Sequence, residues 1–374
     1  MQIDKRSPLR VSASITLILF LSHTAEADNG LNALSDMFSY SGFGTLGIAH
    51  SDTDQAVWVQ NIQTYGATNE NVDYRTDSKL AVQTTVTPTQ WLSGIAQALT
   101  EERYGPAMTT QFEWAFVKVK PLPDLSVRAG RMELPTFLIS DTRNVGYANL
   151  WLRAPDEVYG QPIFDVYTGC DATYQHEVGP YSLSFNVLSG TSTSDTELAP
   201  GVQRRIIGHK MQGYNATLDY LNGITVRVSR VTTDRTHEEY GITHPELSWS
   251  FDSVGVIYDR HDLVLQSEFI ERRTSNPAIN VNGYYLLGGY HLGEWTPYTM
   301  YSVGETIGGA DGTIPFASMH IVSVGVRYDA FKNVDLKAQI EHATAYQGGS
   351  PFENQTTAFN NNGNIASFVV DFMF

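Results

Sequence analysis

Apolar and polar residues alternate with a period of two along most of this chain, and the alternation constrains the fold more than any other feature. Six segments show it most clearly: 80–86, 181–187, 224–229, 263–269, 322–328 and 336–341. Such alternation is typical of β-strands that have one apolar and one polar face. After the first 27 residues, no segment of comparable length shows a convincing amphipathic helical period. The sequence therefore predicts a domain that is nearly all β.

The first 27 residues have a different character. Three basic residues within 1–10 precede an apolar segment, 11–21, and Ala25-Glu26-Ala27 then fits a small-x-small cleavage pattern. These features are typical of a Sec-type secretory signal peptide. The apolar segment is too short to span a bilayer stably, so a membrane anchor is the less favoured alternative. The predicted domains are a signal peptide, 1–27, and a single β domain, 28–374.

Composition excludes several classes of protein. Cys170 is the only cysteine, which rules out an intrachain disulfide framework and a zinc site that needs several thiolates. The chain has 24 Lys+Arg against 40 Asp+Glu and a net charge of -16, which argues against a nucleic-acid partner. Beyond the first segment no run of 18 apolar residues occurs. We predict no cofactor and no metal.

Short turns and long loops are distributed asymmetrically. Turn signals occur at 88–90, 121–124, 179–180, 221–223, 259–262, 293–296 and 329–333. Long polar loops include 51–78, 190–208, 232–246, 304–317 and 347–362. Seven short turns and eight long loops would connect sixteen strands, which is the layout of a transmembrane antiparallel β-barrel of the outer membrane. Fourteen or eighteen strands remain alternatives, because strand boundaries are uncertain by a few residues.

Aromatic residues cluster beside the short turns. A ring of such side chains is expected where lipid headgroups meet hydrocarbon, although strands are also aromatic-rich in general. The residues are Trp91, Tyr181, Tyr220, Tyr258, Trp295, Tyr298, Tyr328 and Phe331.

The last strand carries apolar residues on one face, at Phe368, Val370, Phe372 and Phe374. This strand resembles the C-terminal assembly signal of bacterial outer-membrane barrels.

The chain as a whole resembles the trimeric porins of Gram-negative bacteria. The segments that carry the resemblance are 42–47, 127–131, 324–329 and 336–339. It implies a water-filled, homotrimeric pore in the outer membrane, with short periplasmic turns and long extracellular loops. Outer-membrane lipid and lipopolysaccharide would surround this pore, and its third long loop would fold inward as a constriction.

One interval between turns is longer than a hairpin needs, and it contains residues 132–168, our candidate constriction loop. The chain lacks the dense arginine ladder of general-diffusion porins, which leaves its selectivity open. The net charge favours a mild preference for cations, although much of that charge lies in loops.

Strand phase and loop composition together predict the residues that line the pore. The phase directs Arg227, Arg327, Lys337, Glu268 and Glu341 inward, and Arg128 also if Leu125 and Val127 face lipid. Arg131 has the opposite phase, but the Gly-Arg pattern of the family suggests that a bend brings it inward. The loop supplies Asp141, Arg143, Arg153, Asp156, Glu157 and Asp165.

We hypothesise that acids on the loop face bases on the wall and create a transverse field that orients polar solutes. The alternative is that these are solvated charges without influence on the pore.

The sequence therefore favours a porin for passive diffusion of small hydrophilic solutes and ions, and not an enzyme. A substrate-selective channel is the alternative, and a non-conducting adhesin, a barrel enzyme or a secreted soluble β protein is less favoured. Chain spacing reveals no catalytic constellation. The segment 42–47 matches G-x-G-x-x-G but lacks the βαβ context of a dinucleotide site. His237, Glu238, Glu239 and His244 could hold a divalent cation, but a solvated loop is favoured there.

Overall fold

A computed structural model describes residues 37–60, 66–103, 107–161, 164–199, 202–221, 223–240, 242–276, 280–307, 318–346, 352–353 and 355–374. The predicted signal peptide lies outside these residues. Within the described part of the chain, no helix is both long and apolar enough to cross a membrane.

The strands are β1 (Phe38–Ser51), β2 (Val57–Trp58), β3 (Lys79–Thr89), β4 (Leu92–Glu102), β5 (Met108–Leu122), β6 (Leu125–Glu133), β7 (Val166–Val178), β8 (Tyr181–Ala199), β9 (Val202–Tyr220), β10 (Ile224–Glu239), β11 (Ile242–Arg260), β12 (Leu263–Thr274), β13 (Val281–Tyr290), β14 (Trp295–Thr306), β15 (Ser318–Phe331), β16 (Val334–Tyr346), β17 (Phe352–Glu353) and β18 (Asn362–Met373). The short helices are η1 (Ser140–Thr142), η2 (Gly146–Ala148) and α2 (Asp156–Tyr159).

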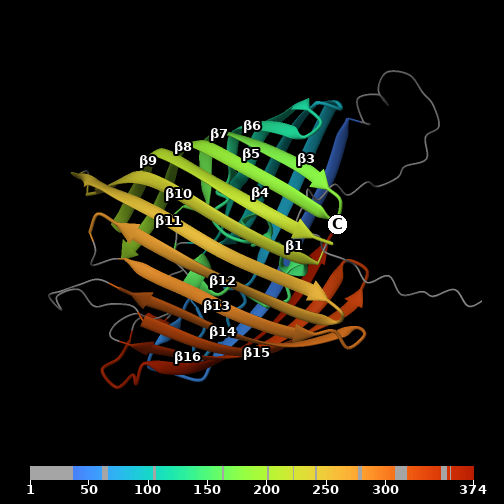
Figure 1. Cartoon of the computed structure of the whole chain (residues 1–374). Coiled ribbons are helices and arrows are strands. Elements are labelled where there is room, and N and C mark those ends of the chain that lie inside the picture. The colour runs from blue at the N-terminus through green and yellow to red at the C-terminus, as the bar shows by residue number, and fades with distance from the viewer. Residues whose placement is uncertain are drawn as a thin grey trace, which may run out of the picture.

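All strands except β2 and β17 form one closed barrel of sixteen antiparallel strands (Figure 1). Each strand pairs with its neighbour in the chain, and β1 pairs with β18 to close the barrel. Closure leaves no unpaired strand edge, which is the condition for a sheet to exist in lipid. The predicted fold class and strand number are confirmed.

The seven predicted short turns fall at every second connection between wall strands, from β3–β4 to β15–β16. Because the strands are antiparallel, these turns all lie at one end of the barrel. Residues with positive φ occur in several of them, including Gly179 (59°), Gly293 (70°) and Asn333 (65°). We call this the short-turn end and the opposite one the long-loop end.

Two predicted long loops are wrong in extent. Residues 190–208 and 232–246 belong mostly to the hairpins β8–β9 and β10–β11, which extend well past their neighbours. Their polar residues continue the cross-strand pairing, as in Asp195 opposite Arg205, whose Nε donates to that carboxylate at 2.8 Å. Polar composition alone does not end a strand, because the backbone ladder does not depend on it.

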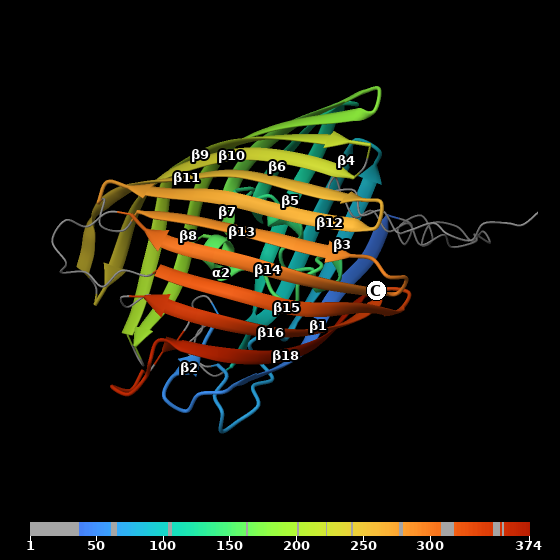
Figure 2. The same ribbon diagram turned by 60° about the horizontal axis from the view of Figure 1, so that its bottom comes forward.

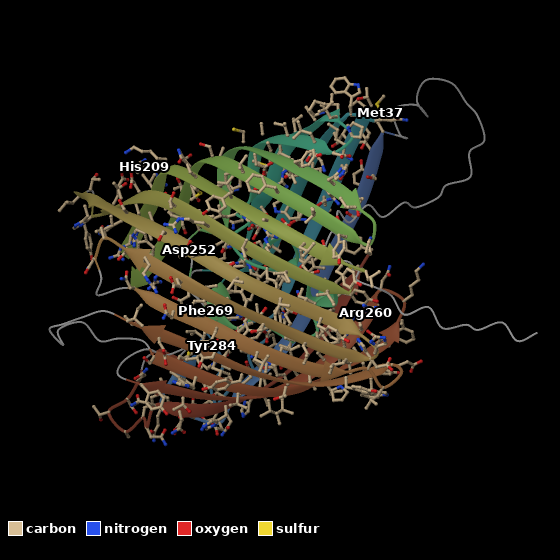
Figure 3. All side chains as sticks on the ribbon, in the orientation of Figure 1. Met37, His209, Asp252, Arg260, Phe269 and Tyr284 are labelled. Atoms are coloured by element: carbon tan, nitrogen blue, oxygen red, sulfur yellow. The ribbon has the colours of Figure 1, made fainter. Side chains whose placement is uncertain are left out.

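The two faces of the wall differ as the alternation requires. Leu46, Val256 and Val324 are exposed on the outside, and Phe269 and Tyr284 extend from the outer surface of β12 and β13 (Figure 3). The alternate positions point inward and are largely polar. Apolar residues therefore face the surroundings of the barrel while polar ones face its interior.

Aromatic residues near the short turns are mostly on the outside. Trp91 and Trp295 are exposed, and the Trp295 ring stacks on Tyr328 with centroids 4.3 Å apart. Tyr298 is the exception, because it is buried and its hydroxyl donates to Gln339 at 2.6 Å inside the barrel. Tyr298 lies three positions after Trp295, and an odd step along a strand reverses the face, so it points the opposite way.

The C-terminal strand closes the barrel beyond β18 itself. The amide of Phe374 donates to the Gly42 carbonyl at 3.0 Å, and the Gly42 amide donates back at 2.9 Å. The Phe372 ring covers Gly44, where a Cβ would lie 2.5 Å from it. Phe368 is exposed on the outside. The assembly role of this strand remains a prediction.

The segment between β1 and β3 packs against the inner wall near the long-loop end. Its strand β2 pairs with β17, and Trp58 lies in an apolar cluster with Ile321, Ala343 and Ile365. The last residues of this segment, 75–78, lie next to the interior of the barrel, where Asp77 pairs with Arg153.

Candidate functional site

Between β6 and β7 the chain leaves the wall, and its described residues, 134–161 and 164–165, run through the interior of the barrel. Figure 2 shows α2 of this segment between the front and rear strands. We call residues 134–165 the lumen loop. It lies within the predicted range 132–168, whose two ends belong to β6 and β7.

An apolar cluster holds the lumen loop against β12, β13 and β14. Trp151 packs with Tyr159 of the loop and with Tyr285 of β13, at ring-centroid distances of 5.9 and 5.4 Å. Wall residues such as Leu287 and Met300 complete the cluster. Burying aromatic side chains of this size contributes several kcal/mol, so the loop is firmly seated here.

Glycines in the wall provide space for the loop. Gly283 of β13 and Gly304 of β14 are register partners, and α2 lies over both of them. A Cβ on Gly283 would approach the Glu157 carbonyl oxygen to 2.2 Å. On β11, a Cβ on Gly255 would meet Leu138 at 2.9 Å.

Polar wall residues also hold the first part of the lumen loop. Arg227 donates from Nη2 to the Pro135 carbonyl at 3.1 Å. Glu268 accepts the Leu138 amide at 2.9 Å and the Tyr159 hydroxyl at 2.7 Å. Both wall residues were predicted to point inward, and both are buried against the loop.

Two predicted bases hold the middle of the lumen loop. Arg327 donates from Nη1 to the Tyr147 and Asn149 carbonyls at 2.8 and 3.2 Å. Lys337 donates from Nζ to the Gly146 carbonyl at 2.7 Å and to Asp371 at 2.9 Å. Both cations are also paired with carboxylates, Arg327 with Asp335 at 3.0 Å and Lys337 with Asp371, so they connect the loop backbone to acids of the wall.

Arg153 fixes the loop to two wall strands, β16 and β18, and to the segment between β1 and β3. Its guanidinium pairs bidentately with Asp77 at 2.9 and 2.6 Å, pairs with Glu341, and donates to Ser367 at 2.7 Å. Its Cζ lies 4.4 Å from the centre of the Trp58 ring. Removing a buried charge with several partners is costly, so Arg153 is a main structural anchor.

Arg143 and Asp165 connect the two ends of the loop. Arg143 Nη1 lies 2.9 Å from Asp165 and its Nη2 lies 3.5 Å from Glu133. Burial acts to raise the pKa of Asp165, but the charge and hydrogen bond of Arg143 outweigh burial and lower it. Asp165 therefore keeps its charge inside the barrel.

Arg128 and Arg131 occupy different environments. Arg128 makes a bidentate pair with Asp171 of β7, with Nη2 to Oδ2 at 2.6 Å. Asp141, which is exposed on the loop, lies within its electrostatic reach. Arg131 instead donates from Nε to the Phe112 carbonyl at 2.6 Å, and Phe112 is exposed on the outside. The structure does not bring Arg131 to the acids of the loop.

The lumen loop also borders a cavity of about 120 Å³, to whose lining Trp151 and Tyr159 of the apolar cluster contribute. The other residues that line it include Thr45 of β1, Gln60, residues 76–79 and residues 101–103 at the end of β4. The acids that line it are Asp77, Glu101, Glu102, Asp156 and Asp165. The bases that line it are Lys79, Arg103, Arg143 and Arg153.

Asp156 and Glu157 are adjacent but have opposite surroundings. Asp156 lines the cavity, whereas Glu157 is fully buried and its side chain lies against Gly304 and Ser302 of β14. Burial raises the pKa of Glu157 to about 8, so it is largely uncharged at neutral pH.

The wall residues of the cavity were not among the predicted pore residues. Glu101 and Glu102 end β4 and Arg103 follows it, with Arg103 Nη2 2.7 Å from Glu101. The signal was a charged run at the end of β4, whose alternation is weaker than that of the strands chosen.

His237 and His244 lie in β10 and β11, not in a loop. Their rings stack with centroids 4.3 Å apart and an interplanar angle of 3°. In the described residues, no third His, Cys, Asp or Glu completes a metal-binding group.

Comparison with solved structures places the chain among barrels of the same architecture. It matches OmpF of Salmonella typhi (13% identity, TM-score 0.58) over 90% of this chain and 97% of that one. It matches an anion-selective porin from Comamonas acidovorans (11%, 0.57) over 90% and 99%. The outer-membrane channel DcaP of Acinetobacter baumannii (9%, 0.58) is matched over 90% and 97%.

These likenesses establish the fold alone. The chain matches no protein-family model and no curated protein.

Proposed function

We propose that this protein is an outer-membrane channel through which small hydrophilic solutes and ions diffuse past the lumen loop. The observation that carries the proposal is the division of the interior. Apolar contacts and backbone hydrogen bonds hold the loop against β10–β16, while a charged cavity remains between the loop and β3–β4. A loop that served only to plug the barrel would need no charged cavity beside it.

The solved structures support this proposal by their own descriptions, since they include a porin and an outer-membrane channel. Acids and bases share the cavity, so a transverse field across it would orient dipolar solutes. A channel selective for particular solutes is the second candidate, because a cavity this small and charged would discriminate by size and charge.

Exposed apolar residues around the wall support a location in the outer membrane, in contact with its lipid and lipopolysaccharide. Homotrimer formation is part of the proposal and rests on resemblance. One matched structure is described as a trimer form of OmpT of Vibrio cholerae. Cross-linking or native mass measurement would test it.

Site-directed labelling tests the channel directly. In a Cys170→Ala background, Ala154→Cys places a thiol on the lumen loop beside the cavity, and Ala96→Cys places one on the outer face of β4. We expect the purified protein to form channels in a planar bilayer. A charged methanethiosulfonate reagent should reduce the single-channel conductance of the Ala154→Cys protein and leave the Ala96→Cys protein unchanged.

Absence of channels in the folded, unlabelled protein would overturn the proposed function. Equal effects of labelling at both positions would place the conducting path elsewhere.

A further inference from the structure

Three arginines lie on wall strands near the long-loop end: Arg204 of β9, Arg235 of β10 and Arg272 of β12. Arg235 and Arg272 lie over the ring of Trp249 of β11, and Arg204 is within electrostatic reach of Arg235. The four residues come from four successive strands. We call this group the arginine cluster.

The contacts within the cluster show that its cations are close together. The Cζ atoms of Arg235 and Arg272 lie 4.7 and 5.3 Å from the centre of the Trp249 ring. Trp249 is 5% exposed and sits beside Phe251, at 5.9 Å between ring centroids. Cation–π attraction to one buried ring therefore fixes both guanidinium groups.

The electrostatic neighbours of these arginines include other arginines. Arg235 is in repulsive electrostatic interaction with Arg204, and Arg272 with Arg235. Among the described residues no carboxylate pairs with Arg235, whereas Arg230 on the outer face of the same strand pairs with Asp252 at 2.9 Å. Repulsion between like charges at partly buried positions is unfavourable unless an anion is present.

The cluster also has donors that lack acceptors. Within the described residues, Nε of Arg235 and Nε1 of Trp249 are buried without a hydrogen-bond partner. Arg272 directs Nη1 to the Gln161 carbonyl of the lumen loop at 3.2 Å, so the cluster adjoins the loop as well as the wall. The two donors of Arg235 and Trp249, beside neighbouring positive charges, are complementary to the oxygens of an anion.

We propose that the arginine cluster binds the oxyanion group, carboxylate or phosphate, of a solute that enters the barrel from the long-loop end. The inference rests on the proposed channel function, to which it adds a binding step before the charged cavity. Guanidinium groups recognise both oxyanions by paired N–H donors, so both chemistries fit. The net charge of the chain is acidic, so the cluster is a local exception that would concentrate anions there.

Calorimetric titration of the detergent-solubilised protein tests the site without requiring conduction. Citrate serves as the carboxylate probe and pyrophosphate as the phosphate probe. Arg235→Gln removes the central charge, and Arg230→Gln is the matched control because it removes the same charge from the outer face of β10. Circular dichroism verifies that each variant is a folded β protein.

We expect saturable binding of at least one probe to the native protein, weakened about tenfold or more by Arg235→Gln. Arg230→Gln should leave the affinity unchanged, and Arg235→Lys should retain part of it because the charge remains without the planar fork. Arg272→Gln should weaken binding in the same way, so the proposal does not depend on one variant being folded.

Absence of binding, or equal binding by the Arg235→Gln and Arg230→Gln proteins, would overturn the site. Bilayer recordings on the same preparations separate the two proposals. A protein that conducts but does not bind either probe refutes only the anion site, and one that binds but does not conduct refutes only the channel.

Discussion

The lumen loop meets the two sides of the barrel in different ways. Towards β12–β14 it buries Trp151, Tyr159 and Phe137 against an apolar wall and lies over paired glycines. Towards β3 and β4 it presents Asp156 and Asp165 to a cavity lined by charged residues. The first side holds the loop by apolar packing, whereas the second holds it by ion pairs, such as that of Arg153 with Asp77, whose members also line the cavity. Substitutions on the apolar side therefore test the position of the loop, and a substitution at Asp156 tests the charge of the cavity.

Breaking the apolar side should have the largest effect. Trp151→Ala removes a side chain that is 2% exposed and contacts both Tyr159 and Tyr285. We expect a loss of about 3–5 kcal/mol in the free energy of unfolding, measured by denaturant titration, together with a higher single-channel conductance. Trp91→Ala, at a Trp that is 55% exposed, is the control and should have a much smaller effect. Equal losses for the two variants would contradict the seating of the loop by this cluster.

Filling a glycine position should have an intermediate effect. Gly283→Ala would place a methyl group 2.2 Å from the Glu157 carbonyl oxygen, so α2 has to move. We expect a cost of about 1–3 kcal/mol and an altered conductance. Gly288→Ala on the same strand meets only Leu265, at 3.6 Å, and should be tolerated. Unchanged conductance in Gly283→Ala, or the same change in both variants, would show that the space at Gly283 does not position the loop.

Single charge changes at Asp156 and Glu157 should have the smallest effect, which is a shift in the reversal potential. They compare the cavity side of the loop with its buried side. At pH 7, Asp156→Asn should shift the reversal potential in a salt gradient towards anions, because Asp156 lines the cavity. Glu157→Gln should leave it unchanged, because Glu157 is buried with a pKa raised by burial to about 8. Equal shifts of the reversal potential in the two variants, or no shift in either, would show that Asp156 does not line the conducting path.

The same carboxyl group gives the pH dependence of stability a definite sign. The native state holds the Glu157 proton to about pH 8, whereas the unfolded chain releases it near the ordinary value of 4.5. Unfolded molecules therefore bind fewer protons in this interval, and the contribution of Glu157 to stability falls as pH rises from 4.5 to 8. Glu157→Gln should flatten that fall, which denaturant titrations at pH 5 and pH 8 would reveal.

Much of the wall could be predicted from the sequence because a strand has a fixed period. The alternation at 224–229 and 336–341 directed Arg227 and Lys337 inward, where both now hold the lumen loop. Turn residues such as Asn333 marked the hairpins, and one overlong interval marked the loop. The extent of β8–β11 was underestimated, since polar strands beyond the apolar belt lack the alternation that reveals them.

The loop has no such period, and its side-chain directions depend on contacts with residues far away in the chain. Asp156 and Glu157 look equivalent in the sequence. In the structure Asp156 faces a cavity, whereas Glu157 is buried against Gly304, which is far away in the chain. The convergence of Arg204, Arg235 and Arg272 likewise arises only when β9, β10 and β12 stand together in the wall. The sequence by itself determined that the chain forms an antiparallel β-barrel with one overlong loop, and it favoured sixteen strands, because strand period and turn chemistry are local properties. Only the tertiary structure decided which charges line the cavity and which are buried, because burial and pairing across the interior depend on residues far apart in the chain.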